Sequence, residues 1–205
     1  MSYIVGVDLG QARDYTAVTV LDVVRQQEIP QGFIWSVAEL REGPVCYHLR
    51  HLERVRDERY PAIVKRVRSL VMALKGDRSV DLVVDATGVG RAVVDLFEEA
   101  GLDPIAVTIT AGDAVNQDGH EWRVPKRDLV SVVRVLLETQ RLKVAASLEL
   151  APVLVDELTS FQMRLTPTGH DSYAAAREGQ HDDLVLATAL ACWWGEQGPG
   201  PLMIW

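Results

Sequence analysis

Two short apolar segments of the chain end in an aspartate, and this repeated pattern constrains the fold more than any other feature. Tyr3 to Leu9 is rich in β-branched residues and contains Asp8, while Val80 to Val84 runs directly into Asp85. Such segments are typical of buried strands. If the two strands are neighbours and parallel, their carboxyl ends bring both carboxylates to one edge of a sheet, where α/β folds bind their ligands.

The rest of the chain alternates between strand and helix patterns. Strands are predicted at Thr16 to Val23, Gly32 to Val37, Val45 to Arg54 and Pro104 to Ile109, helices beginning at Pro61, Arg91, Pro125, Pro152 and Asp182, a loop or small hairpin at Ala111 to Trp122, and a hairpin at Gln162 to Tyr173. This order predicts an α/β fold, with a mixed sheet of three antiparallel strands and then two parallel ones, and helices on both faces.

The composition is that of one acidic globular domain. The chain has 205 residues, of which 48% are apolar, and this suits a single core. We expect a domain over residues 1–195 and a flexible tail over 196–205. The net charge of −8 argues against a protein that coats nucleic acid through bulk positive charge. It does not exclude an enzyme that acts on nucleic acid, because a cluster of metal-binding carboxylates is itself acidic.

The cysteines and the apolar segments favour a cytoplasmic location. Cys46 and Cys192 are isolated, so we expect neither a disulfide scaffold nor a zinc site, and a reducing compartment is the simple interpretation. No apolar stretch approaches the ~18 residues of a membrane span. The first ten residues lack the basic leader and long apolar region of a secretory signal. No membrane partner is therefore expected.

A third acidic position lies near the end of the chain, where Asp182 and Asp183 open the last predicted helix. Acids in a first helical turn favour the helix dipole, and Asp is a common N-cap, so a purely structural role is the alternative. For Asp8, the alternative is a cap of the following turn. Its place inside an apolar segment favours metal binding, because a buried carboxylate is costly unless it is paired or holds a cation.

Carboxylates that converge in this way have one common chemical use, which is to hold divalent cations for phosphodiester cleavage. Mg²⁺ and Mn²⁺ prefer hard oxygen ligands, and two such ions about 3.5–4 Å apart activate a water and stabilise the leaving oxygen. All four aspartates are candidate metal ligands, and Asp8, Asp85 and Asp183 are the catalytic candidates. Asp14 and His181 are auxiliary candidates, although Asp14 also suits a turn and His181 also suits the surface.

Basic residues form three groups in the sequence, and one of them is predicted to contact phosphate. The groups around Arg54 and Arg66 alternate with acids, so we expect solvated faces there. Arg123, Lys126 and Arg127 precede a helix beside a glycine-containing loop and are the candidates for phosphate contact. The chain has neither the GxxxxGK[ST] motif of a P-loop ATPase nor a serine or cysteine arrangement for acyl transfer.

On these residues the chain resembles the C-terminal nuclease domain of the large terminase subunit of tailed phages. The matching segments keep their order over nearly the whole chain: GVDLGQARDYTAVTVLD (6–22), YHLRHLERV (47–55), YPAIVKRV (60–67), VVDATGVGRAVVDLF (83–97), VPKRDLV (124–130) and REGQHDDLVLATALACWW (177–194). The resemblance implies an RNase H-like fold. It also implies metal-dependent, largely sequence-independent cleavage of double-stranded DNA, which in the family cuts phage DNA during packaging.

The resemblance further implies site residues and partners. The three family aspartates fall on Asp8, Asp85 and Asp183, and an auxiliary acid falls on Asp14. The implied partners are double-stranded DNA, a packaging ATPase, the small terminase subunit and the portal. The family's packaging ATPase domain has no counterpart in these 205 residues.

Three other functions are alternatives on the sequence. A sugar-kinase-like ATPase also begins with a strand, an aspartate and a glycine turn, but 205 residues are too few for its usual two lobes. Another RNase H-like nuclease, such as a junction resolvase or RNase H, would use the same aspartates. A non-catalytic DNA-binding or assembly module would keep the fold without cleaving its ligand.

Overall fold

The protein is built on one large mixed sheet. A computed structural model describes residues 2–10, 14–28, 41–76, 78–88, 91–119, 121–165, 171–175 and 181–197. The sheet has eight strands in the order β6-β7-β5-β4-β1-β2-β3-β8. These strands are β1 Ser2–Asp8, β2 Thr16–Glu28, β3 Arg41–Val55, β4 Ser79–Asp85, β5 Pro104–Thr110, β6 Asn116–Asp118, β7 Glu121–Pro125 and β8 Leu142–Val144.

The centre of the sheet confirms the predicted topology. β1, β2 and β3 pair antiparallel, while β4 pairs parallel with β1 and β5 pairs parallel with β4. Val7 of β1 lies opposite Val84 of β4, so the next residue of each strand is Asp8 or Asp85. The two aspartates therefore end adjacent parallel strands at the same edge of the sheet, as the sequence pattern predicts.

The edges of the sheet go beyond the prediction. The segment expected as a loop or small hairpin forms the β6–β7 hairpin, and β7 also joins the sheet parallel to β5. β8 was not predicted, because its three residues are too few to show a period. The hairpin predicted near residue 167 corresponds to β9 Phe161–Leu165 and β10 Asp171–Ala175, which form a separate two-stranded sheet. The strand predicted at 32–37 lies outside the described residues.

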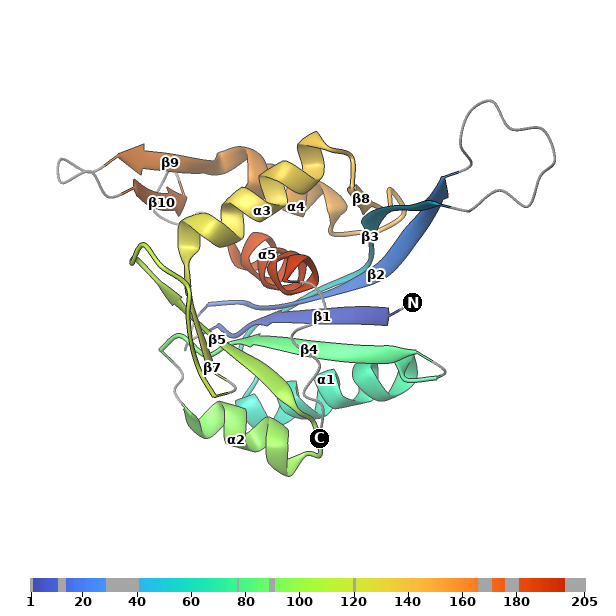
Figure 1. Cartoon of the computed structure of the whole chain (residues 1–205). Coiled ribbons are helices and arrows are strands. Elements are labelled where there is room, and N and C mark those ends of the chain that lie inside the picture. Colours follow the sequence, from blue (N-terminus) through green and yellow to red (C-terminus); the bar gives the residue numbers. More distant parts are fainter. Residues whose placement is uncertain are drawn as a thin grey trace.

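Helices cover both faces of the sheet (Figure 1). α1 Tyr60–Leu74 and α2 Arg91–Glu99 lie on one face, while α3 Lys126–Glu138, α4 Ala151–Ser160 and α5 Asp183–Glu196 lie on the other. Each face has its own hydrophobic cluster, because alternate residues of a strand point to opposite faces. No helix in the described part of the chain is long and apolar enough to span a membrane. The predicted boundary after residue 195 stays a prediction, and α5 extends one residue beyond it.

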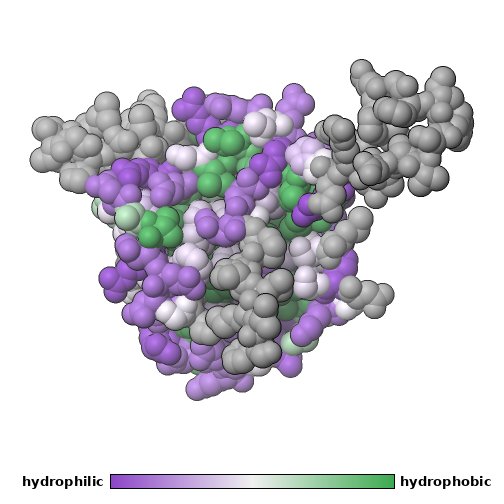
Figure 2. All heavy atoms as spheres, viewed as in Figure 1, coloured by the Kyte–Doolittle hydropathy of each residue, from purple (hydrophilic) through white to green (hydrophobic). Residues whose placement is uncertain are grey.

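The surface is mostly hydrophilic. Figure 2 shows a predominantly hydrophilic face, with small apolar areas between hydrophilic side chains. Among the exposed apolar residues are Val135 of α3 and Val155 of α4. These are single side chains of the kind that most globular proteins expose.

α5 lies between the sheet and the two outer helices, α3 and α4 (Figure 1). Every residue from Asp183 to Trp193 is buried, which explains why this helix is apolar on all sides rather than on one stripe. At its carboxyl end, Glu196 accepts hydrogen bonds from the Tyr47 hydroxyl at 2.6 Å and from Arg141 at 2.8 and 2.6 Å. The helix is thus fixed at the end distant from the aspartates.

The approach of α5 to the sheet depends on Gly6 in the middle of β1. A Cβ atom at this position would lie 2.1 Å from the carbonyl oxygen of Ala187 and 3.1 Å from the Ala191 Cβ. On β2, the next strand, the Thr19 and Thr188 hydroxyls share a buried hydrogen bond of 3.2 Å. A side chain at residue 6 would therefore push the helix away from the strand that carries Asp8.

We expect Gly6→Ala to destabilise the protein by about 1–3 kcal/mol, because a methyl group in a fully packed interface forces the backbone apart. This corresponds to a loss of about 2–4 °C in Tm per kcal/mol for a chain of this size. Thermal unfolding by circular dichroism measures the effect. Gly76→Ala is the matched control, since a Cβ there meets no atom within 4 Å. Equal unfolding temperatures for the two variants would show that the close contact is unimportant.

Candidate active site

The predicted acidic residues converge at one edge of the sheet. They line a hollow of about 310 Å³ formed by Asp8, Leu9, Gly10, Asp14, Tyr15, Asp85, Thr87, His181, Asp182 and Asp183. All four candidate metal ligands are in this set, together with both auxiliary candidates. Residues separated by more than 170 positions in the sequence are therefore brought into one site.

The strands place Asp8 and Asp85 on the side of the sheet that faces α5. In β1 the alternation puts Gly6, which touches α5, on the same face as Asp8. In β4, Val83 belongs to the hydrophobic cluster on the α5 side, and Asp85 follows it by two residues. The Asp85 carboxylate is fixed further by the backbone N–H of Thr87, which donates to its Oδ1 at 2.7 Å.

The start of α5 supplies the other two aspartates. Asp182 occupies the N-cap position, but its side chain makes no capping hydrogen bond. It accepts a hydrogen bond from Lys126 Nζ at 2.8 Å instead. Asp183 lies in the first turn and is 7% exposed. The side chain of Asp182 thus lines the hollow and makes no capping hydrogen bond.

Burial and mutual repulsion raise the pKa values of the clustered carboxyls. The pKa of Asp8 is well above its usual value, first because of desolvation and then because of the charges of Asp85, Asp183 and Asp182. Burial also raises the pKa of Asp85, although its hydrogen bonds with Thr87 oppose the shift. The pKa of Asp183 is raised by burial and partly restored by Arg54. The cluster therefore has more negative charge than its surroundings neutralise.

Arg54 is a site residue that the sequence analysis assigned wrongly to a solvated face. Its side chain is 14% exposed, and its Nε donates to Asp183 Oδ2 at 3.0 Å, while Nη2 donates to the same oxygen. Its guanidinium stacks on the Tyr15 ring at 4.0 Å, and this ring meets His181 edge-on at 5.0 Å. The strand alternation could have found it, because Leu52, two residues earlier, belongs to the cluster beneath α5.

Glu157 of α4 is a second residue that the sequence analysis missed. It is 7% exposed, and its Oε2 accepts hydrogen bonds from the backbone N–H groups of Leu184 at 3.0 Å and Val185 at 3.2 Å. Burial raises its pKa to about 7, against the lowering effect of Arg54. It follows the buried Leu154 by three residues, so an acid on the apolar face of a predicted helix was the available sign.

The donor set fits a hard divalent cation such as Mg²⁺ or Mn²⁺. The site offers several carboxylate oxygens, whose pKa values are raised by burial and then by neighbouring carboxylates, and a cation would favour their charged form. Within the described ranges, no three acidic, histidine or cysteine side chains already stand in a coordinating arrangement. Two of the acids are engaged by cationic side chains, because Arg54 pairs with Asp183 and Lys126 pairs with Asp182.

The predicted phosphate-binding residues lie at different distances from the acids. Lys126 contacts the site directly through Asp182. Arg127 is turned to Asp113, with Nη1 2.6 Å from its Oδ1. Arg123 is an exposed residue of β7. Of the three, the structure thus brings only Lys126 into contact with a described aspartate of the cluster.

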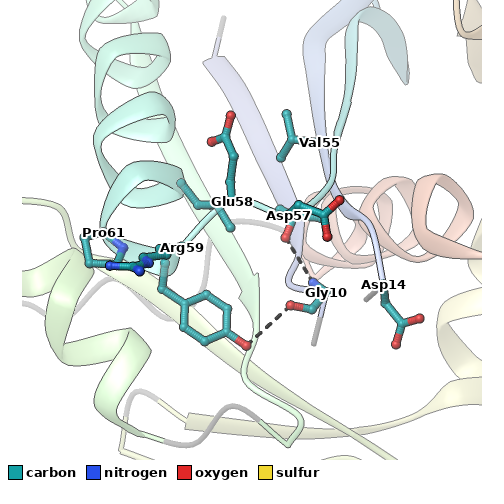
Figure 3. Close-up of a pocket in the computed structure, with 10 residues that line it drawn as sticks. Gly10, Asp14, Val55, Asp57, Glu58, Arg59 and Pro61 are labelled. Carbon is teal, nitrogen blue, oxygen red and sulfur yellow. Dashed lines mark hydrogen bonds between the residues drawn. The ribbon is translucent and has the colours of Figure 1, made fainter. Parts of the chain in front are cut away.

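A cleft of about 460 Å³, shown in Figure 3, adjoins the acidic hollow. The two share Gly10 and Asp14. The far wall of the cleft is the chain from Asp57 into the start of α1, where the Tyr60 hydroxyl donates to the Gly10 carbonyl at 3.4 Å. Asp14 is exposed at the junction, which places the auxiliary candidate beside the entrance rather than among the buried acids.

Comparison with known proteins finds phage terminases. The chain is 26% identical over 190 residues to the terminase large subunit of Thermus virus P23-45 and 25% identical over 190 residues to that of Thermus phage G20c; each match covers 92% of this chain and 31% of the relative. The chain thus spans about a third of the length of these curated relatives. No protein-family model matches the chain.

Solved structures share the fold over almost the whole chain. The large terminase nuclease of thermophilic phage G20c, with bound magnesium, matches with a TM-score of 0.64 and 24% identity, covering 93% of this chain and 80% of that one. The nuclease domain of the bacteriophage SPP1 large terminase, with bound Mn, matches with a TM-score of 0.54 and 11% identity, covering 93% and 85%. The resemblance inferred from the sequence is confirmed, and the fold is the RNase H-like fold of these domains.

We expect Asp8→Asn to stabilise the protein in EDTA by about 1–2 kcal/mol, because it removes the charge that desolvation and three neighbouring carboxylates oppose. A carboxyl whose folded pKa is raised stabilises the fold below its unfolded pKa of about 3.9, and this contribution is lost as the pH rises through the folded pKa. The gain in Tm of the variant over the wild type should therefore grow as the pH rises through the range above about 3.9, the unfolded pKa.

Thermal unfolding across this range measures the difference. Asp103→Asn, at an exposed position before β5 at the opposite end of the sheet, is the control and should leave Tm nearly unchanged. A lower Tm for Asp8→Asn than for the wild type throughout the range would contradict the electrostatic account of the site.

Proposed function

We propose that this chain is a metal-dependent endonuclease that cleaves double-stranded DNA with little sequence specificity, as in phage DNA packaging. The observation that carries the proposal is the convergence of Asp8, Asp85 and Asp183 in one partly buried site, at the sheet edge of an RNase H-like fold. Structures of the G20c nuclease with magnesium, cobalt or zinc bound, and of the SPP1 domain with Mn, support a divalent cation as the cofactor.

Two ions, Mg²⁺ or Mn²⁺, are the cofactor that this donor set suits best. Bound divalent ions supply Lewis-acid activation of water and neutralise the charge that develops on the phosphate. Asp8, which lines the hollow with the β4 and α5 aspartates and whose pKa is raised by burial and by their charges, would be the principal ligand. Asp85 and Asp183 would each complete one site, with Asp182 as a further ligand of the second. The Thr87 N–H holds the Asp85 carboxylate in position for this role.

The protein's own groups also handle protons and the substrate. Binding of cations would displace the protons that the raised pKa values favour on Asp8 and its neighbours. No side-chain nucleophile is required, since water is the attacking group in hydrolysis. Lys126 at the rim of the site, with Arg123 and Arg127 on the same stretch of chain, would contact the phosphates that flank the cleavage point. His181, near Asp183, would face the scissile phosphate.

Partners would compensate for the acidic surface. With a net charge of −8, the domain should bind DNA weakly and with a steep dependence on salt. A packaging ATPase, a small terminase subunit and a portal would hold the substrate and time the cut in the host cytoplasm. The chain covers 31% of its curated relatives, so these activities of the whole assembly belong to the proposal as well.

We expect Asp8→Asn to reduce cleavage of supercoiled plasmid in Mn²⁺ by about a thousandfold or more, because loss of the principal ligand removes several kcal/mol of transition-state stabilisation. Wild-type cleavage should require Mn²⁺ or Mg²⁺ and stop in EDTA. Agarose gels of plasmid incubated with each protein measure both effects. Asp103→Asn changes the same chemistry at the other end of the sheet and should cut as the wild type does.

The same assay separates this function from its alternatives. Preference for a four-way junction or an RNA–DNA hybrid over plasmid would identify another kind of RNase H-like nuclease. Metal-independent DNA binding by well-folded protein, with no cutting in either metal, would indicate a non-catalytic module. Normal cutting by a folded Asp8→Asn variant would refute the proposed site.

We expect Arg123→Ala to weaken DNA binding for all sequences alike and to lower the slope of log affinity against log salt by about one, as loss of one phosphate contact does. Fluorescence anisotropy with a short duplex in EDTA measures binding without cleavage. Arg134→Ala is the control, because this exposed residue of α3 pairs with Glu138. An equal change of slope in both variants would show a general charge effect.

A further inference from the structure

Arg54 lies between two buried acids that belong to different helices. Its Nη2 donates to Asp183 Oδ2 at the start of α5 and also lies 3.3 Å from Glu157 Oε1 of α4. The Glu157 side chain is 6% exposed, so both contacts are shielded from water. The Arg54 guanidinium therefore has two carboxylates that it can reach by a small rotation.

The two oxygens of Glu157 have different surroundings. Oε2 accepts the backbone N–H groups of Leu184 and Val185 and so fixes the first turn of α5. Oε1 accepts no hydrogen bond from any residue that the structure describes. A buried carboxylate oxygen without a hydrogen bond is costly and is uncommon in folded proteins. Oε1 is thus a free acceptor directed at Arg54.

The engagement of Asp183 by Arg54 opposes binding of a divalent cation. The guanidinium donates through both Nε and Nη2 to Asp183 Oδ2, one of the two oxygens that this carboxylate can offer to an ion. If the ion takes this oxygen, Arg54 loses its partner inside the protein. An uncompensated buried charge is strongly destabilising, so the exchange requires a second acceptor for Arg54.

We propose that Arg54 and Glu157 form a counter-ion switch: Arg54 neutralises Asp183 in the metal-free protein and transfers to Glu157 Oε1 when a divalent cation occupies Asp183. The inference rests on the metal site of the proposed function. Both residues are positioning residues, because they act through Asp183. Glu157 Oε2 stays on the α5 backbone during the transfer, so the helix that carries Asp183 does not move. Asp183 thereby has a cationic partner with or without the divalent ion, and Arg54 keeps an anionic one.

The switch makes a specific prediction about Mn²⁺ affinity in four proteins. Arg54→Gln removes the competitor and should raise the affinity about tenfold. Glu157→Gln keeps an oxygen for the α5 N–H groups but removes the anionic acceptor, so Arg54 stays on Asp183 and the affinity should fall about tenfold. When Arg54→Gln is already present, adding Glu157→Gln should change the Mn²⁺ affinity by no more than about twofold. A tenfold coupling equals about 1.4 kcal/mol, within the range for residues in contact.

Electron paramagnetic resonance of free Mn²⁺ during titration measures these affinities in the full chain, without DNA or turnover. Glu58→Gln is the matched control for long-range charge, because this acid of the neighbouring cleft pairs with Arg66 and not with Arg54. Circular dichroism and Tm show whether each variant is folded. If Glu157→Gln fails to fold, Arg54→Gln alone still tests the competition, and unchanged or weaker Mn²⁺ binding by it overturns the switch.

The outcomes separate the switch from the nuclease. If Glu157→Gln lowers the Mn²⁺ affinity equally with and without Arg54, its effect is simple electrostatics and the transfer is overturned. Coupled Mn²⁺ binding in a protein that cuts no plasmid would support the switch and refute the proposed function. Plasmid cleavage by the wild type, together with additive effects of the two substitutions on Mn²⁺ affinity, would support the proposed function and overturn the switch. Failure of the wild-type protein to bind Mn²⁺ would overturn the switch together with its metal site.

Discussion

The close packing of α5 on β1 is the contact on which the rest of the structure depends. It brings the Ala187 carbonyl to a place where only a glycine fits, at Gly6. The same contact sets the height of the first turn of α5 above the sheet edge, and so the separation of Asp183 from Asp8. Because α5 is buried on all sides and fixed by Glu196 at its far end, a shift at Gly6 cannot be absorbed without disturbing the acid cluster.

The charges of the acid cluster oppose folding, because the acids are desolvated and lie close together. Desolvation and like charges raise the pKa of Asp8, and the compensating cations, Arg54 and Lys126, act on the outer acids at the start of α5. Sites that concentrate charge for catalysis commonly sacrifice stability in this way. Glu157 links both needs, because it stabilises the start of α5 through Leu184 and lies beside Arg54. Arg54, Lys126 and Glu157 therefore help to fix the arrangement of the acids.

The shape and charge of the surroundings bear on how a substrate would reach the acids. The hollow adjoins the cleft at the start of α1, which Figure 3 shows, and the two share Gly10 and Asp14. Glu58 and Arg59 both line this cleft. Its walls therefore have charges of both signs.

The sequence by itself determined the strands that end in Asp8 and Asp85 and the helix that begins at Asp182 or Asp183, because hydrophobic periodicity is a local property. The parallel pairing of the two strands was expected from the order of the elements and is fixed by tertiary structure. The sequence analysis left out β8, which is too short for a period, placed Arg54 on a solvated face and did not single out Glu157. These two charges are distant from each other and from Asp183 in sequence, and only the packing of β3, α4 and α5 brings them together. Tertiary contacts decide whether a charged residue lies in solvent or in a buried ion pair, because the sequence around it can look the same in both cases.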